Sequence, residues 1–214
     1  MRAMFMRDEY RLRLILNELV RLYRWVGPDS KQHFIYIYCE EIDSVQTVYH
    51  YIKLNSLIDT SAPELFTFTG GCRNGDEVRN CARVIVTTYG YAGTGTSIPK
   101  MTAMILATSR RAKLKQGLGR CLRRNGDISI TREYVYICDE RTFLRAQLSS
   151  VMTAFQHYDM PVVHTRQRYT EISLAKSDDI DPGDQYHQDS DDQDDIDSDD
   201  FDHAATGPCV IDDE

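Results

Sequence analysis

The chain has 214 residues, with 33 acidic and 25 basic side chains and a formal net charge of −8. Sixteen of the acids and none of the bases fall in residues 177–214, so residues 1–176 carry about +8 and the tail −16. A basic body suits a polyanionic partner, because neutralised phosphates release condensed counterions. The tail has too few apolar residues to offset the entropy of ordering, so we expect it to be disordered.

The six cysteines are spread along the chain with no C-x-x-C spacing and no histidine pair nearby. This pattern disfavours a structural zinc site and a secreted disulfide framework, and it favours reduced thiols. No apolar run approaches the roughly 20 residues that span a bilayer, and the arginine-rich N-terminus lacks the apolar region of a signal peptide. We therefore expect no metal site, no membrane partner, and an intracellular location in the cytoplasm or nucleus.

Helices and strands are predicted to alternate along the chain. Apolar residues recur at helical spacing over residues 8–26, and Gly27-Pro28 ends that helix. Short β-branched and aromatic runs predict buried strands, and amphipathic stretches predict helices. The strands are expected at 33–39, 65–69, 83–88, 102–108 and 133–138, and the further helices at 41–54, 113–124 and 141–158. We also expect a short helix or turn at 75–81, and an edge strand at 162–174 is compatible with the pattern.

Two of these helices have faces that can be assigned from the sequence. In helix 41–54, one face is predicted to hold Ile42, Val45, Val48, Tyr49 and Ile52. In helix 8–26, arginines lie mostly opposite the apolar side, at Arg11, Arg13, Arg21 and Arg24. Such a basic face is either the solvated side of a helix packed on a sheet or a surface for nucleic acid or a partner protein.

Strands that alternate with helices predict an α/β fold, with a mostly parallel central sheet covered by helices on both faces. The crossovers should be right-handed. We expect one domain over residues 1–176, made of the N-terminal helix at about 8–26, a core at about 30–140, and a C-terminal helix and edge strand at 141–174. The acidic tail, 177–214, follows it.

The strand at 83–88 runs into a Gly/Thr loop, YGYAGTGTSIP, at residues 89–99. Ligands of doubly wound sheets lie beyond the carboxyl ends of the strands. There, glycines let the backbone approach a phosphate closely, and Thr and Ser hydroxyls can donate to it. A plain turn is the alternative, and the sequence contains no G-x-x-x-x-G-K-[ST] phosphate loop. Tyr89 and Tyr91 are either core residues or stacking partners for bases.

The helix at 113–124 presents a second phosphate-handling pattern. Gln116, Gly119, Arg120 and Arg123 fall at i, i+3, i+4 and i+7, on one helical face. A glycine costs about 1 kcal/mol of helix propensity relative to alanine, so Gly119 predicts the close approach of another group. Arginine forks bind a transferring phosphoryl group and can contribute roughly 10³–10⁵ in rate. Taken alone, this face could equally be a solvated or phosphate-binding surface.

Together, these stretches resemble the C-terminal, second RecA-like domain of superfamily 2 helicases, especially those of large DNA viruses and phages. Residues 34–38 and the following helix resemble motif IV, and Thr69-Gly70-Gly71 with Arg79 is similar to the segment before motif V. Residues 84–99 resemble motif V, and residues 116–123 match the Q-x-x-G-R-x-x-R form of motif VI. The resemblance covers roughly residues 30–140 and implies a RecA-like three-layer domain.

The resemblance also implies roles for residues at the nucleotide. Arg120 and Arg123 would reach the γ-phosphate of ATP as arginine fingers, and Gln116 would link the nucleotide to the domain interface. Gly119 belongs to the same nucleotide-binding motif. In motif V, Gly95 matches the family's glycine, whereas Ser97 stands where many relatives have aspartate, so the contact usually made by that acid is missing here.

A second group of residues is implied in nucleic-acid binding. Thr69, Gly70, Thr94 and Thr96 would contact the backbone of DNA or RNA. The acidic tail, at its densest over residues 189–202, either solubilises the protein and binds partners or occupies the basic body until nucleic acid competes for it.

Motors of this superfamily hydrolyse ATP between two RecA-like domains, and only the second is recognisable here. No Walker A lysine, D-E-x-[DH] box or motif III precedes residue 30. ATP and Mg²⁺ would then be held mainly by a P-loop-containing first domain, from a separate chain or lost from this reading frame. The sequence therefore predicts the second half of an ATP-dependent nucleic-acid helicase or translocase, of viral origin, that hydrolyses ATP only with that domain.

Two other functions are open to this sequence. A helicase-derived module could bind nucleic acid or a protein of viral replication or transcription without turnover, which the missing phosphate loop favours. Both arginines favour the motor, because a binding module has no need of a finger geometry. A free-standing Rossmann-type enzyme is disfavoured, because no dinucleotide fingerprint follows any strand.

Overall fold

The computed structural model describes residues 8–61, 64–70, 80–92, 100–108, 118–119, 122, 129–138, 145–163 and 165. All of them belong to the first of the two units into which the chain divides, Met1–Asp184. The helices are α2 (Glu9–Arg24), α3 (Ile42–Asn55), α5 (Tyr89–Ala92) and α7 (Arg145–Gln156), with a 3₁₀ turn, η1, at Pro28–Ser30. The strands are β1 (Ile35–Cys39), β2 (Leu65–Phe68), β3 (Val84–Thr88), β4 (Ala103–Leu106) and β5 (Glu133–Tyr136).

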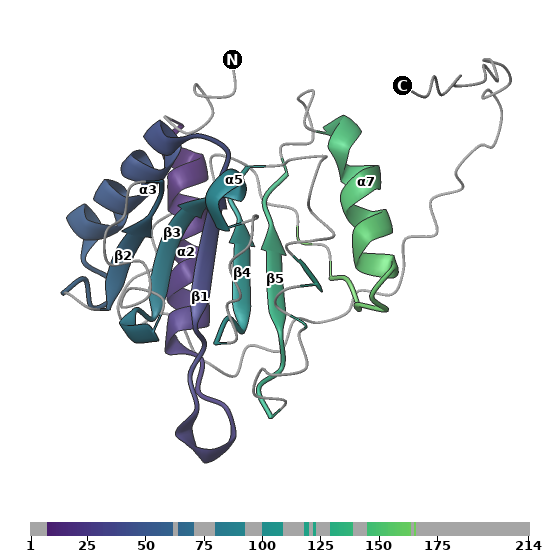
Figure 1. Ribbon diagram of the computed structural model, residues 1–214, viewed down its shortest axis with the longest axis horizontal. Coiled ribbons are helices and arrows are strands. Elements are labelled where there is room, and N and C mark those ends of the chain that lie inside the picture. Colours follow the sequence, from purple (N-terminus) through teal and green to yellow (C-terminus); the bar gives the residue numbers. More distant parts are fainter. Residues whose placement is uncertain are drawn as a thin grey trace, which may run out of the picture. The chain divides into compact units, whose positions relative to one another are not determined.

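The five strands form one sheet in the order β2-β3-β1-β4-β5, and every neighbouring pair is parallel. The predicted α/β architecture, a parallel sheet with flanking helices, is therefore confirmed (Figure 1). All five strands were predicted, each within two residues at both ends. The described part of the expected edge strand, residues 162, 163 and 165, belongs to no strand. Of the expected short helix or turn at 75–81, residues 80 and 81 are helical, and residues 75–79 lie outside the described residues.

Alternate residues of each strand pack against different helices. Ile35 and Ile37 of β1 face a core formed with α2 and α3, whereas Tyr36 and Tyr38 face a second core that includes α7. Figure 1 shows α2 behind the sheet and α7 beyond β5. Because both faces are covered, the central strands β1 and β4 are buried at every position and carry only aliphatic, aromatic or sulfur-containing side chains, as buried parallel strands require.

The connections between strands lie on one face of the sheet when the chain moves toward the β2 edge and on the other face when it moves toward the β5 edge. From β1 it runs through α3, on the α2 side, toward the β2 edge, whereas from β4 it passes Leu118, on the α7 side, toward the β5 edge. A reversal of direction combined with a reversal of face preserves the hand of the crossover. The sheet is therefore doubly wound around β1.

Local sequence explains the bounds of α2. Its N-cap Asp8 accepts a hydrogen bond from the N–H of Tyr10 at 3.0 Å, and basic residues lie in the last turn, where they favour the helix dipole. The C-cap residue, Trp25, folds back over Gly27, and a Cβ on Gly27 would lie only 2.1 Å from an atom of the Trp25 ring. The Gly27-Pro28 stop is thus also a packing requirement of Trp25.

Two predicted helix faces need correction. Arg11 does not lie on a solvated side of α2, because it is only 2% exposed. In α3, Val45, Val48 and Ile52 are buried as predicted, but Ile42 is 55% exposed. Ile42 is the first residue of α3, where the chain has only just left the sheet, so its side chain falls outside the core.

Candidate functional site

The carboxyl edge of the sheet is the candidate functional site. The strands on either side of β1 are followed by segments on the α7 face, α5 after β3 and Leu118 after β4, whereas β1 is followed by α3 on the other face. Such a topological switch point leaves a crevice at the carboxyl ends of the strands, where doubly wound proteins bind ligands. Figure 1 places α5 at this end of β1 and β3.

Tyr89, the first residue after β3, ties this edge together. Its hydroxyl donates to the carbonyl of Thr108, which follows β4, and its ring lies 5.4 Å from that of Tyr38 at the end of β1. Burial raises the pKa of Tyr89 well above its ordinary value. The suggested stacking of Tyr89 on bases is therefore wrong, because a side chain that is 5% exposed and bonded within the core offers no free face.

Tyr91 brings two of the predicted motifs side by side. Its ring meets Phe68 edge-on at a centroid distance of 4.6 Å, and a Cβ on Gly70 would lie 4.0 Å from it. The Oγ1 of Thr88 accepts a hydrogen bond from the N–H of Tyr91 at 3.3 Å, which fixes the start of α5. The Thr69-Gly70 segment and the α5 part of the motif V-like segment thus lie together, with Thr69 half-buried and Gly70 exposed.

The motif VI-like segment is described at three positions. Leu118 is fully buried in the α7-side core, and the N–H of Leu122 donates to its carbonyl at 3.2 Å, so this stretch makes one helical turn. The predicted close approach at Gly119 comes from Tyr158, whose hydroxyl would lie 2.7 Å from an added Cβ. The other predicted site residues lie outside the described residues: Gln116, Arg120, Arg123, Gly95, Ser97, Thr94 and Thr96.

Arg11 joins the ends of β4 and β5 from the α2 side. Its Nε donates to the carbonyl of Ala107 at 3.0 Å, and one Nη donates to the carbonyl of Ile137 at 3.2 Å. Burial raises the pKa of the nearby Cys39 thiol to about 12, although the charge of Arg11 opposes the shift. Cys39 is therefore a protonated, unreactive core residue. The sequence did not reveal Arg11, because its acceptors are backbone carbonyls about a hundred residues away.

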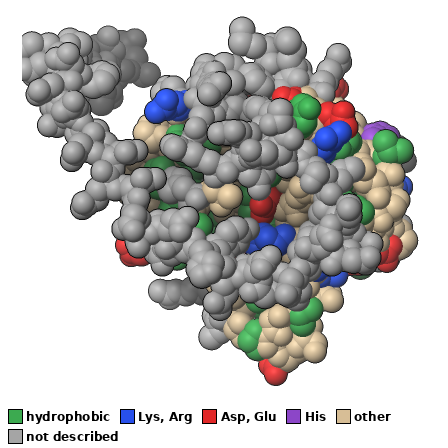
Figure 2. Space-filling view, turned by 180° about the vertical axis from the view of Figure 1, so that it is seen from behind, with side chains coloured by type: hydrophobic (Ala, Val, Ile, Leu, Met, Phe, Trp, Pro, Cys, Tyr) green, Lys and Arg blue, Asp and Glu red, His purple; other side chains and the backbone are tan. Residues whose placement is uncertain are grey.

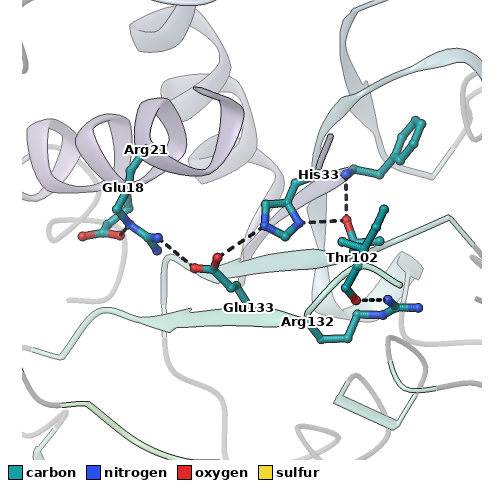
Figure 3. Close-up of polar contacts among 8 residues, drawn as sticks. Glu18, Arg21, His33, Thr102, Arg132 and Glu133 are labelled. Carbon is teal, nitrogen blue, oxygen red and sulfur yellow. Dashed lines mark hydrogen bonds and ion pairs between the residues drawn. The ribbon is translucent and has the colours of Figure 1, made fainter. Parts of the chain in front are cut away.

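A polar cluster lies at the opposite, amino-terminal edge of the sheet (Figure 3). His33 is fully buried, with Nδ1 3.1 Å from Thr102 Oγ1 and Nε2 3.4 Å from Glu133 Oε1. Arg21 of α2 forms an ion pair with Glu133 at 2.8 Å and another with Glu18 at 3.0 Å. All groups are satisfied when Thr102, which accepts from the N–H of Phe34, donates to Nδ1 and Nε2–H donates to Glu133.

Burial alone would raise the pKa of Glu133, but the hydrogen bond with His33 and the charge of Arg21 outweigh it. The pKa falls from its ordinary 4.5 to about 2. The sequence does not reveal this pair, because Glu133 is a hundred residues from His33 and only the β1-β4-β5 order brings the starts of these strands together. Because the cluster lies at the edge away from the candidate site, its role is structural.

The charges of α2 are largely engaged within the fold. Arg13 pairs with Glu9, and Arg21 pairs with Glu18 and Glu133. Figure 2, which views the molecule from behind, shows described Lys and Arg side chains next to Asp and Glu. Over the described residues, no helix has the length and apolarity to cross a membrane, and no group of three His, Cys, Asp or Glu side chains could hold a metal ion.

Comparisons with known proteins bear on the carboxyl-edge motifs. No protein-family model matches the chain. A protein of African swine fever virus (strain Badajoz 1971 Vero-adapted), "Putative ATP-dependent RNA helicase QP509L", is 28% identical over 176 residues, which cover 78% of this chain. The same protein from a Tick/Malawi isolate is 27% identical over 176 residues. The chain matches only about a third, 34%, of the length of these relatives.

Among solved structures, T4 UvsW aligns with 73% of this chain and 34% of its own, with a TM-score of 0.52 and 14% identity. The chain is similar to the C-terminal, RecA-like domain of superfamily 2 helicases. The ATP-dependent Type ISP restriction-modification enzyme LlaBIII, solved bound to DNA, aligns over 70% of this chain with a TM-score of 0.51 and 14% identity. These structural likenesses establish the fold, and the viral relative supports a helicase-related domain.

Proposed function

We propose that this chain is the second RecA-like half of an ATP-dependent nucleic-acid helicase or translocase. In this proposal, it supplies arginine fingers and nucleic-acid contacts to a motor whose phosphate loop belongs to a first RecA-like domain. The viral relative, whose name describes an ATP-dependent RNA helicase, supports the proposal through homology over 78% of this chain.

The observation that carries the proposal is the arrangement of the carboxyl edge. Gly70 lies beside Tyr91, so the Thr69-Gly70 segment lies next to the described part of the motif V-like segment, three residues before Thr94 in the sequence. Tyr89 bonds to Thr108, from which the chain continues toward the motif VI-like turn at Leu118. In this proposal, the nucleic-acid strand and the nucleotide are bound by segments that follow different strands of the same sheet, at its carboxyl edge.

For the nucleotide, the proposed donors fit ATP by their chemistry. The guanidinium groups of Arg120 and Arg123 match phosphate oxygens, and the amide of Gln116 can bond beside them. Gly119, Gly95 and Ser97 complete the proposed nucleotide contacts. ATP and Mg²⁺ would be held mainly by the first domain, and the metal would neutralise charge on the phosphates.

For nucleic acid, we propose that Thr69, Gly70, Thr94 and Thr96 contact the phosphate backbone. Contacts of this kind position a strand without reading its sequence. The net charge of about +8 on residues 1–176 would add a salt-dependent attraction. Given the viral relative, the protein would act inside an infected host cell, in replication or transcription.

A second candidate is a helicase-derived module that binds nucleic acid or a replication or transcription protein without turnover. The observation that favours it is the lack of G-x-x-x-x-G-K-[ST] in the printed sequence. The two candidates differ in whether ATP hydrolysis by a complex containing this chain depends on Arg120.

The test is capture of the tagged full chain from infected cells, followed by mass spectrometry and assay of nucleic-acid-stimulated ATPase in the eluate. The motor predicts a partner with a phosphate loop, and loss of an arginine finger, Arg120→Ala, should lower kcat by roughly 10³-fold or more. Arg124→Ala removes a neighbouring arginine outside the motif and should retain activity. ATPase that survives Arg120→Ala, or no ATPase in any complex, would favour the binding module.

A further inference from the structure

The motif VI-like turn is held from outside the motif by two tyrosines. Leu118 is fully buried in the core cluster that also includes Ala154 and Phe155 of α7. Its carbonyl accepts a hydrogen bond within the turn, from the N–H of Leu122 at 3.2 Å, and another from the hydroxyl of Tyr134 in β5 at 3.5 Å. One end of the turn is therefore tied to the sheet.

The second contact falls on Gly119. A Cβ at this position would lie 2.7 Å from the hydroxyl of Tyr158 and 3.6 Å from its Cζ. A carbon atom does not approach a hydroxyl oxygen as closely as 2.7 Å without a shift, whereas 3.6 Å between two carbon atoms is ordinary van der Waals contact. An alanine here would force the hydroxyl group of Tyr158 to shift, whereas the ring itself leaves room for a methyl group.

Tyr158 is held where it makes this contact. Beyond α7, the N–H of Asp159 donates to the carbonyl of Gln156 at 3.1 Å, and the N–H of Met160 donates to that of Phe155 at 3.2 Å. This pair of bonds, with Asp159 in the left-handed conformation at φ 50°, is a Schellman motif. The backbone on both sides of Tyr158 is therefore fixed, and its side chain can transmit the position of α7 to the turn.

We infer that Tyr158 and Tyr134 are positioning residues that fix Leu118 and Gly119, the two residues that precede Arg120 in the sequence. This inference rests on the proposed function only for the use made of Arg120. Small displacements of a group that meets a transition state are costly in rate, so the position of the residues that lead into Arg120 matters for its use.

The first test reads the geometry with no nucleotide present. In the full-length chain, Tyr158→Ala should speed hydrogen exchange at residues 118–124 by about tenfold, as expected for a lost anchor. It should also change the rate at which phenylglyoxal modifies Arg120. Tyr158→Phe keeps the ring in place and should behave like the unmodified chain, as should Gln156→Ala, an exposed change at the same helix end.

The second test covers the case in which Tyr158→Ala does not fold. Gly119→Ala should speed exchange in the turn, because its methyl group meets the hydroxyl, and adding Tyr158→Phe should restore slow exchange. This rescue would support the inference. Equal effects of Gly119→Ala in both backgrounds, or no effect of Tyr158→Ala on the turn and on Arg120, would overturn it. Failure of the proposed function would appear separately, as ATPase that does not depend on Arg120.

Discussion

Arg11→Met should strongly destabilise the domain, although the position looks like one of several surface arginines in the sequence. Methionine keeps most of the aliphatic packing of the 2%-exposed side chain and removes its donors. The carbonyls of Ala107 and Ile137 then lose the guanidinium at the ends of β4 and β5. A buried acceptor left without its donor costs about 1–3 kcal/mol, so two give about 2–6 kcal/mol.

We expect the lower part of that range, about 2–4 kcal/mol, because the burial of a guanidinium is itself costly and methionine removes that cost. For a domain of this size, the melting temperature should fall by roughly 5–15 °C. Urea unfolding followed by circular dichroism, and thermal unfolding of the same samples, would measure the change.

The matched control is Arg13→Met, two residues along the same helix. Arg13 forms an ion pair with the exposed Glu9, four residues before it, and a hydrogen bond with Tyr51, and it bonds no strand end, so its loss should lower the unfolding midpoint far less than the loss of Arg11. If both variants lose stability equally, or neither does, then the carbonyl contacts of Arg11 do not stabilise the ends of these strands.

Three further predictions concern stability and the tail. Glu133→Gln should lower the free energy of unfolding by roughly 2 kcal/mol at neutral pH. The difference should disappear as pH falls from about 4.5 to about 2, because a carboxylate with a lowered pKa stabilises the fold only while ionised. Urea unfolding between pH 2 and 7 would show a difference that does not change with pH if the ion pair were unimportant. Ser56→Gly should raise the free energy of unfolding by about 0.5–1 kcal/mol, because Ser56 ends α3 in the left-handed region, which glycine adopts more readily. Gln46→Gly, within α3, should lower it by a similar amount. A loss of stability in both variants would contradict the idea that the backbone of Ser56 is strained. Deletion of residues 177–214 should tighten DNA binding at low salt, and the difference should vanish near 1 M salt, where the Debye length is about 3 Å. Fluorescence anisotropy titrations would measure both affinities, and equal affinities at low salt would show that the tail does not compete with DNA.

The predicted strands proved accurate because each is a short apolar run closed by polar residues. The strand centred on Ile37 is apolar on both sides of the sheet, and this pattern needs no partner to be recognised. The α5 turn was not predicted, because YGYA reads as part of a glycine-rich loop. Thr88 accepts from the N–H of Tyr91 within the turn itself, but the bond from Tyr89 to Thr108 exists only once β3 and β4 flank β1.

The candidate site was predicted in part. Gly119 was correctly expected to lie close to another group, since glycine is costly in a helix, but the sequence could not reveal that this group is Tyr158. From the sequence, Tyr89 could be either a core residue or a stacking partner for bases, and its burial at the switch point shows that it is a core residue. The roles of Arg120 and Arg123 remain proposals that rest on the family resemblance.

By itself, the sequence determined the alternating α/β pattern, the uneven charge and the motif spacing, because these depend on neighbours within a few residues along the chain. Only the tertiary structure decided which side chains meet across the sheet. It buried Arg11 against two strand ends, and it brought Glu133 to His33, because the order β2-β3-β1-β4-β5 places distant segments side by side. Periodicity records which face of an element is apolar, but strand order and register set the partner that each face meets.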